Sequence, residues 1–273
     1  MFINRREMKS SAKESMRNTR PSPILVTLVY ILLTTGVNGI ILGAVVLRVG
    51  PGEVYYWLSE GYALSEILYG SLGSVGSTLF VFANILFALY SVIMAFGYTS
   101  YTLNVARNQE SGYGMLLDGF SLAGRVLLLT FLEGLFVFLW SLLFIIPGIV
   151  AAYRYRMAYY VLLDDPDCGA LEAIRRSKAM MADHKAELLI FDLSFINWYL
   201  LLVAAFLISY IIVSVTGLPD FVSDAVTYLL GLLLSLWMKP FIHCTTANFY
   251  AAIGGGRQTE EPPLWSSGPD GRF

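Results

Sequence analysis

The chain has 273 residues, of which 56% are hydrophobic and only 14% are charged, and its mean hydropathy is +0.64. Because a soluble domain carries about 25% charged residues, this composition excludes an ordinary water-soluble protein. The net charge of −2 does not by itself decide for or against a nucleic-acid partner, and we expect none. Several apolar runs approach or exceed the roughly 20 residues with which a helix crosses a bilayer. The sequence therefore predicts an all-α, polytopic transmembrane bundle.

Residues 1–20 have the pattern of a short, basic amphipathic helix on the cytoplasmic side. Met8, Ala12 and Met16 recur every four residues and so share one helical face. The same segment contains six Lys and Arg residues. The apolar run 24–47 that follows is too long for a signal-peptide core of about 7–15 residues, so we interpret it as a retained first span.

The apolar runs predict about six spans in a single transmembrane domain over residues 21–253. These spans are 24–47, 77–103, 126–146, 149–163, 187–214 and 224–250. The third should stop at Pro147-Gly148, a strong helix breaker, and the chain should return through 149–163. That return segment reaches only about 22 Å at about 1.5 Å per residue, so five crossings remain an alternative. The polar tail, 254–273, is predicted to be disordered.

Lys and Arg are distributed unevenly over the predicted loops. The 104–125 loop has two and the 164–186 loop has four, whereas the 48–75 loop has one and the 215–223 loop has none. Because cytoplasmic loops carry the excess of these residues, we expect a multi-pass protein of the cell inner (plasma) membrane with the N- and C-termini cytoplasmic. Both basic loops would lie inside, so the chain between them crosses the membrane twice or not at all.

A second amphipathic helix is predicted over residues 169–185. Its less polar face contains Ala173, Ile174, Ser177, Met180 and Met181, and its other face contains Glu172, Arg175, Arg176 and Asp183. Such a helix lies in the membrane interface, with Arg175 and Arg176 as cations that face the lipid headgroups. We therefore expect anionic membrane lipids as partners, and leave open an unidentified membrane-protein partner.

The second half of the chain contains an ordered series of sequence blocks. They are 139–149, Tyr153, Tyr155, Met157, 164–166, 172–174, Ser177, 180–181, 184–185, 193–195, Trp198, Pro240 and 246–250. In this order, the blocks resemble the bacterial membrane protein family called domain of unknown function 975, over roughly 96–253. The sequence departs from the family pattern at Phe241, where Tyr is usual, and at Asn197, where Gly is expected. The resemblance implies a helical integral membrane protein and no particular activity.

The sequence has no motif that is typical of an enzyme or a metal site. We find no GxGxxG, Walker, HExxH, GxSxG or EF-hand pattern. The two cysteines, Cys168 and Cys244, fall in different predicted elements and do not suggest a disulfide framework. The two histidines are too few for a His-rich metal centre. We therefore expect no catalytic activity, no metal and no cofactor.

Several ionisable residues fall at membrane depth, where each is expensive by about 2.5–3.5 kcal/mol on insertion scales. The candidates for intramembrane polar or ligand-binding residues are Glu133, Arg154, Arg156, Asp192, Lys239 and His243. We expect the two acids to neutralise two of the three cations, with Lys239 left over as the candidate site for an anionic ligand. Snorkelling of the arginines and hydrogen bonding between helices are the structural alternatives.

These features predict a non-catalytic integral membrane protein. Its expected role is to handle or sense a lipid or amphiphile, or to assist another membrane component. The alternative is a small transporter or permease-like protein for an anionic solute, which the buried charges and the broken helix at Pro147-Gly148 would suit. An intramembrane enzyme ranks last, because no nucleophile–base pair is apparent.

Overall fold

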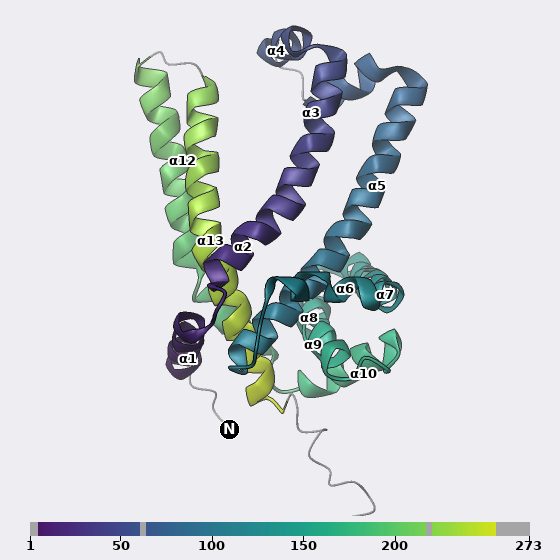
Figure 1. Ribbon diagram of the computed structural model, residues 1–273, viewed down its shortest axis with the longest axis vertical. Coiled ribbons are helices and arrows are strands. Elements are labelled where there is room, and N and C mark those ends of the chain that lie inside the picture. The colour runs from purple at the N-terminus through teal and green to yellow at the C-terminus, as the bar shows by residue number, and fades with distance from the viewer. Residues whose placement is uncertain (1–4, 61–63, 217–219, 255–273) are drawn as a thin grey trace, which may run out of the picture.

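The computed structural model describes residues 5–60, 64–216 and 220–254, and within these ranges the protein is all-α, without strands. Figure 1 shows long helices that come together at one end, where most of the shorter helices gather, and that spread apart toward the other end. The elements are α1 (Arg5–Asn18), α2 (Pro23–Ile31), the π-helical turn η1 (Leu32–Gly36), α3 (Val37–Val49), α4 (Pro51–Ser59), α5 (Leu64–Ala106), the 3₁₀ turn η2 (Tyr113–Leu117), α6 (Asp118–Ser121), α7 (Ala123–Leu143), α8 (Ile145–Tyr155), α9 (Ala158–Asp164), α10 (Ala170–Met180), α11 (Lys185–Leu193), α12 (Ile196–Thr216) and α13 (Asp220–Ala252).

Five stretches of the described residues are long and apolar enough to cross a membrane. They are Pro23–Val49, Gly70–Ala106, Ala123–Leu143, Lys185–Thr216 and Val226–Ala252. The prediction of an all-α, polytopic protein is therefore confirmed, and these stretches correspond to five of the six predicted spans. The remaining one, 149–163, is not a continuous helix, because the chain leaves α8 after Tyr155 and re-enters a helix only at Ala158. The predicted tail, 254–273, lies almost entirely outside the described residues.

The turn between α7 and α8 falls earlier than the sequence predicts. Helix α7 ends at Leu143, Phe144 has extended backbone angles, and α8 begins at Ile145. Pro147 lies in the first turn of α8, where a missing N–H removes no helical hydrogen bond. Gly148 lets the two helices approach closely, because a Cβ atom there would be only 2.0 Å from the Ser141 Oγ. The Pro-Gly pair therefore packs the hairpin and does not form its turn.

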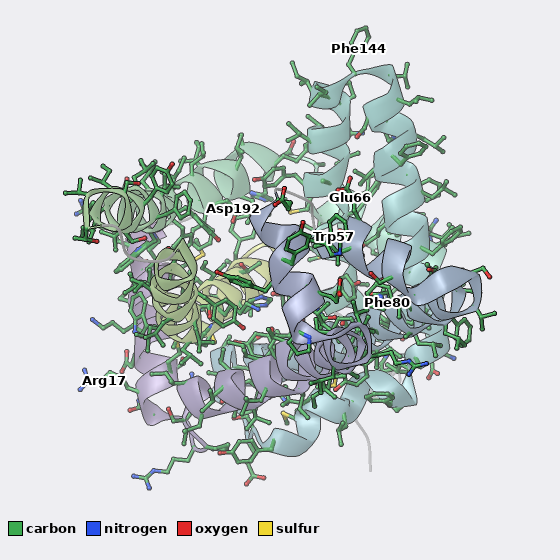
Figure 2. All side chains as sticks on the ribbon, turned by 90° about the horizontal axis from the view of Figure 1, so that it is seen from above. Arg17, Trp57, Glu66, Phe80, Phe144 and Asp192 are labelled. Carbon is green, nitrogen blue, oxygen red and sulfur yellow. The ribbon has the colours of Figure 1, made fainter. Side chains whose placement is uncertain are left out.

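The hairpin of α7 and α8 runs across the long helices. Figure 2 looks along α12 and α13, and shows the hairpin from the side with Phe144 at its tip, pointing away from the bundle. Both ends of the hairpin lie at the end of the molecule that also contains α1 and α10 (Figure 1). The chain between the two basic loops thus leaves and returns at the same end, while α4 lies at the other end.

The buried core is concentrated at the end where the short helices gather. Its largest fully buried side chains include Phe96, Tyr98 and Tyr101 of α5, Phe191 of α11 and Phe249 of α13. Helix α1 joins this core, since α1 packs on α13 and α5. The apolar face of the N-terminal amphipathic helix therefore contacts protein. Away from the core, α3, α5 and α12 expose many large apolar side chains, as lipid-facing helices do.

Candidate functional site

A cavity of about 330 Å³ lies where α5, the junction of α8 and α9, and α13 meet. It is lined by Ala95, Thr99, Arg156, Tyr159, Tyr160, Ile242, His243 and Thr246. Two of the candidate residues from the sequence, Arg156 and His243, are thus brought together, although 87 residues separate them in the chain. The others, Glu133, Arg154, Asp192 and Lys239, do not line this cavity.

The break between α8 and α9 places Arg156 at the cavity. Ser177 of α10 holds this break, because its hydroxyl donates to the Arg154 carbonyl oxygen at 2.8 Å and accepts from the Met157 N–H at 3.1 Å. Tyr155 and Met157, on either side, are buried, whereas Arg156 is exposed. The guanidinium is therefore reachable from outside the protein, while its neighbours anchor the backbone in the core.

An aromatic column supports the α13 side of the cavity. The ring of Tyr98 meets His243 edge-on, with 5.0 Å between the ring centroids, and stacks on Tyr30 at 4.6 Å. The Tyr98 hydroxyl is hydrogen-bonded to Thr27 at 2.8 Å. Lys239 places its Nζ atom 5.1 Å from the centroid of the Tyr30 ring, which is a cation–π geometry. Lys239 thus contacts the far end of the column, away from the cavity lining.

The acids expected to neutralise the buried cations form no direct ion pair with them in the residues that the structure describes. No oxygen of Glu133 or Asp192 lies within 4.0 Å of a nitrogen of Arg154, Arg156 or Lys239 in those residues. Asp192 instead accepts a hydrogen bond from the Tyr153 hydroxyl at 3.1 Å. Glu133 has a buried Oε1 atom without a hydrogen-bond partner in the described chain. Arg156 therefore lines the cavity without a direct ion pair among the described residues, although its charge acts on the Glu133 carboxyl at longer range.

An ion-pair cluster that the sequence did not reveal connects α5, α9 and α13 beside the cavity. Arg107, just beyond α5, binds both carboxylate oxygens of Asp164 at the end of α9, at 2.7 and 2.8 Å. Tyr250 of α13 donates a third hydrogen bond to Asp164 at 2.8 Å. The hydrogen bonds from Asp164 raise the pKa of the Arg107 guanidinium above its ordinary value. The sequence contains no signal for this contact, because Arg107 is 57 residues away from Asp164.

The two cations of α10 are engaged with neighbouring acids. Arg175 and Arg176 both bind Glu172, and Arg176 also binds Asp165 at 2.8 Å. These hydrogen bonds lower the pKa of the Glu172 carboxyl. Arg175 remains 78% exposed, whereas Arg176 is 29% exposed. The apolar face of α10 is buried against α7, α8 and α9, so protein covers the face that was expected to enter the lipid interface.

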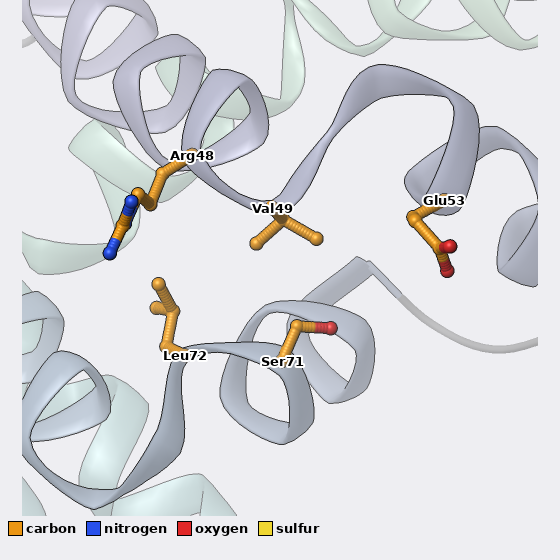
Figure 3. A pocket seen from close by; sticks show the side chains of 5 residues that line it. All are labelled: Arg48, Val49, Glu53, Ser71 and Leu72. Atoms are coloured by element: carbon orange, nitrogen blue, oxygen red, sulfur yellow. The ribbon is translucent and has the colours of Figure 1, made fainter.

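A second cavity, of about 460 Å³, lies at the opposite end of the molecule, between α3, α4 and α5. Figure 3 shows Arg48 and Glu53 on either side of Val49, with their charged groups pointing apart, and Ser71 and Leu72 below them. None of the candidate residues from the sequence lines this cavity. A substitution in this second cavity can therefore serve as a control for substitutions in the Arg156 cavity.

Comparison with known proteins gives one family. Residues 142–256 match the family model described as "Protein of unknown function (DUF975)". The match begins later than the region of roughly 96–253 over which the resemblance was expected, and it includes Arg156, Ser177 and His243. No curated protein and no solved structure matches the chain. Over residues 142–256, the chain is therefore similar to the DUF975 family of proteins of unknown function.

Proposed function

We propose that the protein is a non-catalytic, multi-pass membrane protein that binds an anionic amphiphile in the cavity of Arg156 and His243. One observation carries this proposal. Arg156 holds an exposed guanidinium at a cavity between apolar helices, with no carboxylate within 4.0 Å among the described residues. A guanidinium has five N–H donors in a planar fork, which fit a phosphate or carboxylate, so an anionic headgroup is the natural ligand.

The lining of the cavity suits a ligand with one polar and one apolar part. Ala95 and Ile242 provide apolar surface beside Arg156 and the hydroxyls of Thr99 and Thr246. Pockets for small ligands typically combine apolar walls with a few placed polar groups. Since the long helices around the cavity expose apolar side chains, a lipid can place its headgroup in the cavity and its chains against the helices.

The hydrogen bonds that the lining threonine hydroxyls donate favour a non-catalytic role. The Thr99 hydroxyl donates to the Ala95 carbonyl at 2.9 Å, and the Thr246 hydroxyl donates to the Ile242 carbonyl at 2.8 Å. A hydroxyl that bonds its own helix in this way is not activated by a base, as a nucleophile must be. Within the described residues, we find no hydrogen bond between His243 and either threonine. The cavity thus supports binding and not covalent chemistry.

Lipid binding by purified protein tests this proposal. We expect native mass spectrometry to detect an anionic phospholipid bound to the wild type, and the Arg156→Gln variant to lose it. Arg48→Gln is the matched control, because Arg48 is also exposed and lines the cavity at the other end. Equal retention of anionic lipid by Arg156→Gln and the wild type would contradict the proposal. Retention of a small anionic solute in place of a lipid would favour the transporter alternative.

A further inference from the structure

The hydrogen-bonding groups that line the Arg156 cavity divide into donors and acceptors. Arg156, His243 and the Tyr160 hydroxyl make no hydrogen bond within the described residues, so their N–H and O–H groups are available to a ligand. A neutral imidazole has one N–H, a phenol has one O–H, and a guanidinium has five N–H groups. This set of donors recognises an anion.

The remaining polar groups of the lining have already used their hydrogens. Thr99 and Thr246 donate to carbonyl oxygens of their own helices, as described above. Thr130 of α7 likewise donates to the Val126 carbonyl at 2.8 Å, so in its contact with Tyr159 the tyrosine must be the donor. Each of the three lining oxygens, on Thr99, Tyr159 and Thr246, therefore offers lone pairs only.

Buried acceptors of this kind can bind hydrogen-bond donors of a ligand. Thr99 and Thr246 are only 9% and 4% exposed, so few water molecules reach them. Each hydroxyl already makes one hydrogen bond, and its oxygen keeps a lone pair that can accept a second one. A simple anion would use only the donors of the cavity, whereas an anion that also carries hydroxyl groups would use both the donors and these acceptors.

We infer that the ligand is a polyol phosphate, namely a phosphate ester that carries free hydroxyl groups, such as the phosphoglycerol headgroup of an anionic lipid. This inference rests on the proposed function and specifies its ligand. Arg156 binds the phosphate, with His243 and Tyr160 as further donors. Thr99, Tyr159 and Thr246 accept hydrogen bonds from the hydroxyls of the polyol.

A pair of lipids with equal charge isolates the role of the hydroxyls. Phosphatidylglycerol and phosphatidylmethanol are both monoanionic phosphodiesters, but only the first has free headgroup hydroxyls. We expect vesicles of phosphatidylglycerol to bind the full-length protein more tightly. Thr99→Val and Thr246→Val should each weaken phosphatidylglycerol binding about threefold to tenfold, the effect of one lost hydrogen bond, and leave phosphatidylmethanol binding unchanged.

Thr245→Val is the control for these variants. Thr245 is fully buried on α13 and bonds the Phe241 carbonyl at 2.6 Å, yet it does not line the cavity. It should leave the preference between the two lipids unchanged. Thermal unfolding of each variant in detergent identifies any that fails to fold, and Thr→Ser variants at 99 and 246, which retain the hydroxyl, should restore the preference.

The outcomes separate the two proposals. If Arg156→Gln leaves both lipids bound, the anion site itself is wrong. If Arg156→Gln abolishes binding of both lipids but the valine variants weaken both equally, the anion site stands and the polyol inference is overturned. Competition with free glycerol phosphate distinguishes the source of the headgroup. Displacement of the lipid by equimolar free ester would assign the site to the soluble compound, and failure to displace it would assign the site to the lipid.

Discussion

The hydroxyl of Ser177 accepts a hydrogen bond from the backbone N–H of Met157 across 3.1 Å, at the break between α8 and α9. The same hydroxyl donates to the carbonyl of Arg154. A side chain of α10 therefore satisfies backbone groups on both sides of Arg156. The cavity depends on this contact, because it fixes the position from which the Arg156 side chain extends.

Replacement of Ser177 by Ala should destabilise the protein and weaken ligand binding together. The change leaves a buried N–H and a buried carbonyl without their partner, which costs about 1–3 kcal/mol for each such group. Thermal unfolding in detergent and anionic-lipid binding would be measured on the same sample. Ser214→Ala is the control, since the Ser214 hydroxyl bonds the Tyr210 carbonyl on an exposed part of α12. An unchanged unfolding temperature in Ser177→Ala would mean that the break holds itself open without α10.

The contact between Arg107 and Asp164 should contribute more to stability than any ion pair on α10. The two side chains are 26% and 18% exposed, and the geometry is bidentate. Hydrogen bonds to charged groups contribute about 1.5–3 kcal/mol, so Asp164→Asn should lower the free energy of unfolding by about that amount. The double variant with Arg107→Met should lose less than the sum of the single variants, because no unpaired charge remains. Additive losses would show that the two residues act independently.

The pH dependence of α10 follows from the sign of the shift at Glu172. Hydrogen bonds from Arg175 and Arg176 lower the pKa of this carboxyl below its ordinary value of 4.5. The contribution of Glu172 to stability is therefore complete above pH 4.5 and is lost as the pH falls through the lowered pKa. Glu172→Gln should unfold at a lower temperature than the wild type near neutral pH, and this difference in unfolding temperature should disappear in acid. Because these side chains face water, the difference should also shrink at high salt. A difference in unfolding temperature that persists in acid would show that it does not come from the ionised Glu172 carboxyl.

The sequence predicted the helical class because that class depends on apolar runs, which are local. It also identified the apolar faces of α1 and α10, since Met8, Ala12 and Ala173 of these faces are buried. It did not predict what covers those faces. Amphipathic periodicity is the same whether a helix packs on lipid or on protein, so only the tertiary contacts decide between them.

The ionic contacts were the least predictable part of the site. The energetic cost of a charge at membrane depth identified Glu133 and Arg156 as candidate polar or ligand-binding residues. This cost does not say which residue each of them contacts. Asp164 was not among the candidate residues, because it binds a side chain that is 57 residues away in the sequence. The aromatic support of His243 also had no signal in the sequence, because it depends on helices α2 and α5 that approach α13 only in the folded chain.

The position of the α7–α8 tip distinguishes the fold described here from a protein with six crossings. If 149–163 crossed the membrane, Phe144 would lie near the outer surface. In the structure, the hairpin runs across the long helices and begins and ends beside α10 (Figures 1 and 2). Phe144, Ile145 and Ile146 are 73–77% exposed at its tip. Burying such a side chain is favourable by about 1.5–3 kcal/mol, so we expect all three to lie in lipid and not in water.

Cysteine labelling tests this expectation in a background without Cys168 and Cys244, both of which are free and buried. Single cysteines at positions 60, 115, 170 and 218 should be labelled by an impermeant maleimide from outside, inside, inside and outside, as the distribution of Lys and Arg predicts. A cysteine at 144 should react from neither side of intact membranes and should react fully after denaturation. Labelling from outside would restore the sixth crossing, and labelling from inside would place the tip in the cytoplasm. Protection from both sides would support a hairpin that starts and ends at one end of the bundle and keeps its tip in lipid, which leaves Arg156 and α10 on the same side of the bilayer.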